Sequence, residues 1–278
     1  MIKKIVSALL HYRTFLITSH TNPDGDSIGS QIALALLLKR LNKKVTIIDE
    51  NPVPQIYRFL PHSDFILTPT PDLIRGSTPN SFQAAIVLDC GNLERVGKVG
   101  SLIKGKPCLP AGRPIINIDH HLDNDLFGSL NWVDKKASSV AEQIFFISKI
   151  LGLTLNKKLA TLLYTGIITD TGSFQYHLSP FTHKIVGTLV SKGAVPEEIT
   201  KNVYQSLPFA AFKLFGLALS TLRQTENHKV CWMRVTKEMY RKTKTSPEDT
   251  EPFINYLQQI KDLKILFILK EASRNKTK

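Results

Sequence analysis

Short apolar runs alternate with longer mixed stretches along the first part of the chain. Four of the runs span residues 15–18, 45–48, 84–88 and 115–118. They predict parallel strands covered by helices on both sides, because each is short and largely apolar on both faces. Three aliphatic-rich stretches, at residues 27–41, 139–151 and 156–168, predict helices. This alternation indicates an α/β fold with a doubly wound, mostly parallel sheet.

The pattern changes after about residue 181. It predicts three helices, then a strand, a helix and a strand: residues 182–192, 195–206, 210–225, 229–235, 253–259 and 265–269. We therefore expect three parts, which are a first α/β domain over residues 1–185, a helical connector over 186–225 and an incomplete second α/β domain over 226–278.

The formal net charge of +13 is strongly basic. Such a balance suits an acidic ligand such as phosphate or nucleic acid. It is equally consistent with lysines that only keep the chain in solution, so charge alone does not decide between the two.

The three cysteines, Cys90, Cys108 and Cys231, are scattered along the chain. They indicate neither a disulfide framework nor a cysteine zinc site, and they fit a reducing compartment. The N-terminal apolar run stops at His11 without a cleavage site, and no stretch approaches the ~20 apolar residues of a membrane span. We expect a cytoplasmic protein that does not engage a membrane.

Carboxylates and imidazoles directly follow three of the predicted strands. They are His20, Asp24 and Asp26 after the first strand, Asp89 after the third, and Asp119, His120 and His121 after the fourth. The carboxyl ends of parallel strands form one ligand crevice, so these side chains should meet there. Clustered carboxylates repel each other unless a cation or proton intervenes. Mixed His and Asp ligands suit Mn, Zn or Fe better than Ca.

Each of these motifs also has an ordinary interpretation. Asp24 and Asp26 could form a turn or a helix cap, and Asp89 could mark a strand end. Asp170 could simply end a helix before Gly172. However, an aspartate at the negative end of a helix dipole is unfavourable, and a metal ion would offset that cost. The joint placement at strand ends favours metal binding.

The ordered motifs resemble the DHH phosphoesterase superfamily, which includes RecJ-type exonucleases. The segments SHTNPDGDSIGS, VLDCGNLERVG, INIDHH, ASSVAEQI and GIITDTGSFQY are similar to its nanoRNase subgroup, the bifunctional oligoribonuclease/pAp phosphatases. The resemblance covers about residues 10–225. It implies a hydrolase of short RNA oligonucleotides or pAp with two Mn²⁺ ions per site, with Mg²⁺, Co²⁺ or Zn²⁺ as alternatives.

The resemblance also implies roles for individual residues. The implied metal ligands are His20 and Asp24 on one ion, Asp26, His120 and Asp170 on the other, and Asp89 between both.

The implied catalytic residues are Asp89, His121 and Asp119. His121 would lie beside the substrate phosphate as a hydrogen-bond donor or acid, and Asp119 would orient the histidines. Ser138 and Ser139 are expected mainly to cap a helix, with phosphate contact as a second role.

Other polar and aromatic residues are weaker candidates for substrate contact. Arg95, Arg113 and the basic segment 241–244 could attract nucleic acid, although a solvated surface role is as simple. Phe174 and Tyr176 follow Asp170 and could stack on a base, but core packing explains them equally well.

The chain departs from the family pattern near its end. A glycine-rich Gly-Gly-Gly-His substrate-binding segment is absent from the sequence. We expect either a truncated chain or a divergent one, in which the metal site is complete and the substrate site is not. A partial domain would expose apolar surface, which favours association and a possible homodimer.

Several rival functions remain open. A cyclic-dinucleotide phosphodiesterase shares the core motifs. A family II pyrophosphatase is a more distant rival, because that family lacks a segment like VLDCGNLERVG. A metal-binding but catalytically impaired protein is a rival outside the enzymes. A Rossmann-type cofactor domain is disfavoured, because no Gly-x-Gly-x-x-Gly follows the first strand.

Overall fold

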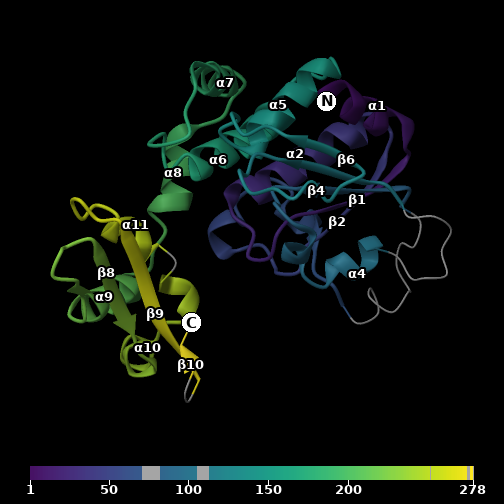
Figure 1. Ribbon diagram of the computed structural model, residues 1–278. Coiled ribbons are helices and arrows are strands. Elements are labelled where there is room, and N and C mark those ends of the chain that lie inside the picture. The colour runs from purple at the N-terminus through teal and green to yellow at the C-terminus, as the bar shows by residue number, and fades with distance from the viewer. Residues whose placement is uncertain (71–81, 105–112, 251, 274–275, 278) are drawn as a thin grey trace. The chain divides into compact units, whose positions relative to one another are not determined.

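The computed structural model describes residues 1–70, 82–104, 113–250, 252–273 and 276–277. The chain divides into two compact units, Met1–Val203 and Tyr204–Lys278. The first unit is built on a six-stranded sheet and the second on a smaller four-stranded sheet (Figure 1). The expected α/β class is therefore confirmed, whereas the three-part division at residues 185 and 225 stays a prediction.

All neighbouring strands of the large sheet run parallel, in the order β3-β2-β1-β4-β5-β6. The strands are β1 (Thr14–Thr18), β2 (Lys44–Ile48), β3 (Ile66–Leu67), β4 (Ala84–Leu88), β5 (Ile115–Asp119) and β6 (Leu130–Val133). The four predicted strands match β1, β2, β4 and β5. The sequence pattern missed β3, which has only two residues, and β6, which is only partly buried.

Helices and short 3₁₀ segments complete the first unit. They are α1 (Ile2–His11), α2 (Gly25–Arg40), η1 (Gln55–Tyr57), η2 (Ser63–Phe65), η3 (Leu93–Val96), α4 (Val99–Lys104), α5 (Val140–Ile150), α6 (Lys157–Asp170), α7 (Pro180–Ser191) and α8 (Pro196–Tyr204). Helix α2 packs on β1, β2 and β4, and α5 and α6 pack on α2. In Figure 1 these helices cover one face of the sheet, and α4 lies on the other.

The α4 face has its own apolar core. Leu16, Ala85 and Val87 of the sheet pack there with Val96 and Ile103 of the η3–α4 segment. With helices on both faces, the sheet is doubly wound, as the sequence predicted.

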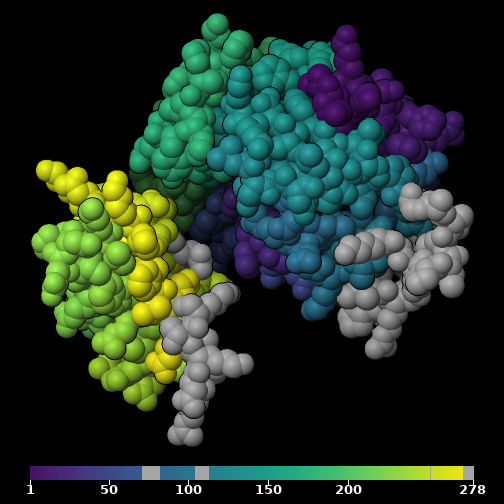
Figure 2. Space-filling model, viewed as in Figure 1, coloured from purple at the N-terminus to yellow at the C-terminus, as the bar shows by residue number. Residues whose placement is uncertain are grey.

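Helix α1 contacts α5 and β6 and buries Ile5 and Leu9. Figure 2 shows the purple N-terminal segment lying against the teal segment that contains these elements. The N-terminal apolar run that stops at His11 is therefore part of the fold. Among the described residues, no helix combines the length and the apolar character that a membrane span requires.

Helices α2 and α6 cross closely because glycines replace side chains at their contact. A Cβ at Gly29 would lie 2.5 Å from the carbonyl oxygen of Leu162. A Cβ at Gly166 would lie 2.6 Å from Oδ1 of Asp26 and 2.6 Å from Cβ of Ala141. This crossing leaves room for the Asp26 side chain between the helices.

The second unit has a mixed sheet in the order β10-β9-β8-β7. Its elements are α9 (Phe209–Leu219), β7 (Arg223–Gln224), β8 (Val230–Val235), α10 (Lys237–Thr243), η4 (Pro247–Thr250), α11 (Phe253–Leu257), β9 (Ile265–Ser273) and β10 (Lys276–Thr277). β8 and β9 are parallel, whereas β7 and β10 pair antiparallel with them. Leu214, Met233, Phe253 and Leu257 share its core.

One predicted element of this unit is wrong in extent. The sequence predicted a helix over 210–225, but α9 ends at Leu219 and Arg223–Gln224 forms the edge strand β7. The hydroxyl of Thr221 accepts a hydrogen bond from the backbone N–H of Arg234 in β8, at 2.8 Å. Pairing with β8 therefore overrides the helical pattern. Cys90 and Cys231 are free thiols, and Cys108 lies outside the described residues.

Candidate metal centre

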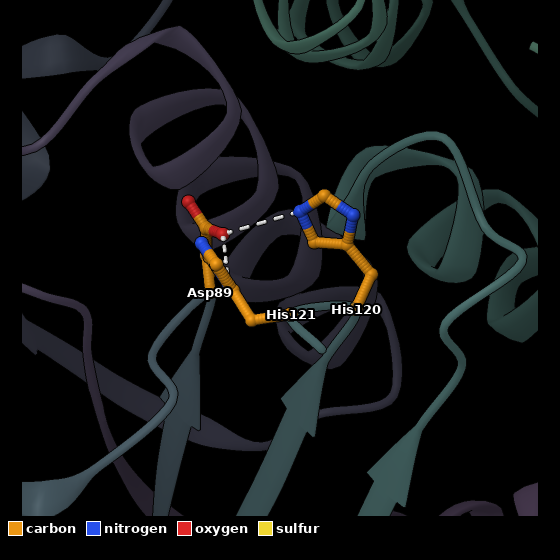
Figure 3. Close-up of side chains that lie close together, drawn as sticks. All are labelled: Asp89, His120 and His121. Carbon is orange, nitrogen blue, oxygen red and sulfur yellow. Dashed lines mark ion pairs between the residues drawn. The ribbon is translucent and has the colours of Figure 1, made fainter. Parts of the chain in front are cut away.

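The strand order of the large sheet reverses between β1 and β4. In doubly wound sheets, ligands bind at such a switch point, outside the carboxyl ends of the strands. Asp89 directly follows β4, His120 directly follows β5, and His20 lies two residues beyond β1. Three strand ends therefore deliver polar side chains to one place, as Figure 3 shows for Asp89, His120 and His121.

The loop from β1 into α2 is shaped by its own polar side chains. Nδ1 of His20 lies 2.8 Å from the carbonyl oxygen of Thr21, which fixes this nitrogen as a donor. Nε2, on the other side of the ring, lies 2.8 Å from the hydroxyl of Ser27. The carboxylate of Asp24 caps α2 by accepting the backbone N–H of Ser27 at 3.0 Å. The hydroxyl of Ser27 in turn donates to Oδ2 of Asp89 at 2.7 Å.

These contacts form what we call group one, which consists of His20, Asp24 and Asp89. One ligand atom from each of the three lies within 4.8 Å of the others. Nε2 of His20 is 3.5 Å from Oδ2 of Asp89. Nitrogen and oxygen donors at this spacing can share a single divalent cation.

Asp26 is held differently, because it is completely buried in the first turn of α2. Its Oδ2 accepts the backbone N–H of Val140 at 2.6 Å, and its Oδ1 accepts the N–H of Ala141 at 2.8 Å. Ser30 adds a third hydrogen bond to Oδ1 at 3.2 Å. The N-terminus of α5 therefore both orients this carboxylate and favours its negative charge.

Asp26 belongs to group two, together with His120 and Asp170. Their ligand atoms also lie within 4.8 Å of one another. Nε2 of His120 is 3.2 Å from Oδ2 of Asp170 and 3.7 Å from Oδ1 of Asp89. This buried nitrogen makes no hydrogen bond of acceptable geometry, which is costly unless another partner satisfies it. A divalent cation among these donors fits that requirement.

Asp89 connects the groups. It belongs to group one, and it also forms a third cluster with His120 and His121. Oδ1 of Asp89 lies 3.7 Å from Nε2 of His120 and 3.6 Å from Nδ1 of His121 (Figure 3). The backbone of Asp89 has φ +54°, a left-handed conformation that non-glycine residues rarely adopt. Such strain is typical of functional positions.

His121 is oriented by a chain of buried polar residues. Its Nδ1 lies 2.7 Å from Oδ1 of Asp119. The side-chain amide of Asn124 donates to Oδ2 of Asp119 at 2.6 Å and to Oδ1 of Asn117 at 2.8 Å. Asn117 then donates to the carbonyl oxygen of Cys90, at 3.2 Å. These contacts fix the orientation of the His121 ring.

The charges of group one shift each other's protonation. Burial by itself would lower the pKa of His20, but its hydrogen bond with Asp89 and the nearby negative charges raise that pKa to about 9. Burial and the charge of Asp89 raise the pKa of Asp24. Burial would also raise the pKa of Asp89, but its contacts with His120 and His20 hold it well below its usual range.

Group two shows the same behaviour. Burial and the charges of Asp89 and Asp170 raise the pKa of Asp26 well above its usual value. Burial raises the pKa of Asp170 to about 7 against the opposing effect of His120. Burial would lower the pKa of His120, but contact with Asp89 and the charges of Asp170 and Asp26 raise it to about 10. Without a cation the groups therefore retain protons, which a cation would displace.

Ser138 and Ser139 are completely buried at the start of α5. Ser139 caps the helix by accepting the N–H of Glu142 at 3.2 Å, so the expected capping is confirmed for this serine. Ser138 donates to Oε2 of Glu142 at 2.7 Å, and Thr182 of α7 donates to the same oxygen at 3.0 Å. Contact of either serine with phosphate stays a prediction.

A second buried network supports the β1 loop. Asp49, after β2, accepts the backbone N–H of Ser19 at 3.0 Å and the side-chain amide of Gln31 at 2.8 Å. Burial raises the pKa of Asp49 to about 6 despite these hydrogen bonds. The network fixes the residue that precedes His20.

The structure places all six predicted ligands in group one or group two. The weaker candidates behave differently. Arg95 supports the β1 loop through its backbone, because its carbonyl oxygen accepts the N–H of Thr21 at 2.6 Å. The guanidinium of Arg113 lies over the ring of Phe82, 4.2 Å from its centroid.

The sequence interpretation missed Asn117, Asn124, Glu142 and Asp49. Two of these residues could have been identified from the sequence. Asn117 interrupts an otherwise aliphatic strand, and Glu142 stands three residues after Ser139, which is the spacing of a capping box.

Comparison with known families and proteins agrees with this geometry. The family model described as "DHH family, N-terminal domain" matches residues 14–167, which is more than half of the chain. The chain belongs to the DHH family. The His and Asp clusters of its first unit are consistent with the divalent-metal binding of that family's phosphoesterases.

Two curated relatives of this DHH-family chain are bifunctional oligoribonuclease and PAP phosphatases. The protein from Thermus thermophilus is 33% identical over 207 residues, which cover 74% of this chain and 58% of that protein. The protein from Bacillus subtilis is 26% identical over 267 residues, covering 94% of this chain and 79% of its own length. The alignment thus spans little more than half of the Thermus relative.

The fold of the DHH-family chain is also seen in a solved structure. The crystal structure of an exopolyphosphatase-related protein from Bacteroides fragilis matches it with a TM-score of 0.88 and 27% sequence identity. The match covers 98% of this chain and 80% of that one.

Proposed function

We propose that this chain hydrolyses short oligoribonucleotides and removes the 3'-phosphate of pAp, with two Mn²⁺ ions bound by groups one and two. The observation that carries the proposal is the position of Asp89, which belongs to group one and whose Oδ1 lies 3.7 Å from Nε2 of His120 in group two. The names of the Thermus and Bacillus relatives support the choice of substrate. The mixed nitrogen and oxygen donors suit Mn²⁺, and Mg²⁺, Co²⁺ or Zn²⁺ are alternatives to test.

In this proposal His20 and Asp24 bind one ion, and Asp26, His120 and Asp170 bind the other. Asp89 serves both. When bound, two such cations activate water at neutral pH and neutralise charge on the phosphoryl oxygens.

His121 has the separate role of contacting the substrate phosphate. Its ring is half-buried, and its hydrogen bond with Asp119 raises its pKa. A protonated His121 can donate to a phosphoryl oxygen or to the leaving oxygen. Asp119 positions the ring and holds its Nδ1 in the donor state.

A substrate panel tests the proposal. The purified chain with Mn²⁺ is incubated with pAp, a 5'-phosphorylated diribonucleotide, inorganic pyrophosphate and a cyclic dinucleotide, and the products are separated by chromatography. We expect AMP from pAp and mononucleotides from the diribonucleotide. Hydrolysis of only pyrophosphate or only the cyclic dinucleotide, or bound metal without any product, would contradict the proposal.

The variant His121→Gln separates catalysis from metal binding. It should lower kcat by about 10²- to 10⁴-fold, the usual contribution of a general acid or base, while two ions stay bound. Metal content by mass spectrometry and turnover on pAp are measured on the same sample. Loss of an ion from this variant would assign His121 to metal binding instead.

A further inference from the structure

Two segments of the chain directly follow residues of the three clusters, one after His121 and the other after Asp170. Both carry exposed apolar side chains. Leu122 is 69% exposed, and Tyr176 is 47% exposed. The metal centre, which is buried and charged, therefore has apolar side chains in the segments that border it.

The turn after Asp170 has an unusual backbone. Gly172, Ser173 and Phe174 are consecutive residues with φ of +54°, +60° and +66°. Left-handed conformations are unfavourable for residues with a Cβ, and they persist only where surrounding contacts enforce them.

Thr171 supplies those contacts. Its hydroxyl accepts the backbone N–H of Phe174 at 3.1 Å. Its carbonyl oxygen accepts the N–H groups of Gln175 and Tyr176 at 2.8 and 3.2 Å. Thr171 is completely buried, and its own hydroxyl donates to the carbonyl oxygen of Ile167 in α6 at 2.7 Å. The turn is thereby anchored to the helix that carries Asp170.

The two aromatic residues of this turn have different environments. The ring of Phe174 packs edge-on against Tyr164, with centroids 6.3 Å apart, and lies 6.0 Å from the ring of His183. Tyr176 instead folds back over Gly172, so closely that a Cβ there would collide with the phenol. Phe174 therefore anchors the turn, whereas Tyr176 presents a partly exposed ring against Gly172, which stands two residues after Asp170.

We propose that Tyr176 is a stacking platform for a nucleobase of the substrate. This inference rests on the proposed function, since it requires a nucleotide whose phosphate lies at groups one and two. An exposed, rigidly held aromatic ring stacks on any base with little loss of side-chain freedom. The strained turn explains how the ring is kept over Gly172, close in the chain to Asp170, instead of in the core.

The test compares two substrates that differ only in the base, which are pAp and ribose 3,5-bisphosphate. In Tyr176→Ala, the ratio of kcat/KM for pAp to kcat/KM for the base-free compound should fall about tenfold, the loss expected for one stacked base. Tyr176→Phe keeps the ring and should restore the ratio to within about twofold of the unaltered chain. Ile150→Ala removes an exposed apolar side chain at the far end of α5 and should leave the ratio unchanged.

An equal loss on both substrates in Tyr176→Ala would mean that the residue only supports the turn, and it would overturn the proposal. No loss on either substrate would overturn it as well. If the unaltered chain hydrolyses neither compound, the proposed function fails, and calorimetric binding of the same two compounds in the presence of Mn²⁺ makes the comparison instead. A preference for pAp that Tyr176→Ala abolishes would still establish the platform.

Discussion

Group one and group two each hold two carboxylates close together, but different parts of the fold position them. Group one relies on a loop, in which Asp24 caps its own helix and Ser27 ties that helix to Asp89. Group two relies on helix ends, because Asp26 accepts two N–H groups from α5, whose residue Val140 lies 114 positions away in the sequence. A local helix cap thus helps to shape group one, whereas the carboxylate of Asp26 in group two is held mainly by a tertiary contact with α5.

The largest effect is expected from Asp89, the residue that both halves share. Asp89→Asn keeps the size of the side chain and tolerates the left-handed backbone, so it removes mainly the charge. We predict that the variant loses both ions and all measurable turnover. Metal content after gel filtration measures this. Two ions at full occupancy would show that Asp89 does not bridge the groups.

Replacing one carboxylate from each group should separate the halves. Asp24→Asn is expected to lose the ion of group one and to keep the other, since asparagine still caps α2. Asp26→Asn is expected to lose only the ion of group two. Calorimetric titration with Mn²⁺ should give one site for each variant. Loss of both ions from either variant would mean that the groups do not bind metal independently.

Protonation should couple to metal binding in both groups. The raised pKa values of Asp170, His20 and His120 give stability to the metal-free fold at low pH, and this stability is lost as pH rises through about 7, 9 and 10. Asp89, with a lowered pKa, contributes constantly above about pH 4.

Between pH 6 and pH 8 we therefore predict that the midpoint of thermal unfolding falls for the metal-free chain. Over the same range the stabilisation by Mn²⁺ should grow, because deprotonated ligands bind metal more tightly. Thermal unfolding with and without Mn²⁺ measures both effects. A midpoint that rises with pH without metal would contradict the assigned protonation.

The smallest effect is expected from removing a hydrogen bond that supports the N-terminus of α5. Thr182→Val removes the hydrogen bond from α7 to Glu142. It should lower the affinity of group two for its ion a few-fold and leave the affinity of group one unchanged. Ser179→Ala is the matched control, because it removes a cap of α7 without touching Glu142. Each should cost about 1 kcal/mol of stability. Equal metal affinities in the two variants would exclude a role for this contact in positioning Asp26.

The same contrast explains what the sequence could predict. The ligands were found because strand ends of a parallel sheet meet at one edge, a rule that needs only the order of the strands. The spacing of Ser139 and Glu142 marks a helix start, but the support that α5 gives to Asp26 could not be found, since no local pattern tells which helix end reaches Asp26. The reason for a glycine at positions such as Gly166 could be given only after the crossing of α2 and α6 was known.

The central claim is that two cations bind side by side with Asp89 between them. Anomalous X-ray scattering from crystals grown with Mn²⁺ tests it most directly. We predict two peaks about 3.5–4 Å apart, one beside His20 and Asp24 and the other beside Asp26 and Asp170. A single peak, or peaks remote from Asp89, would contradict the account.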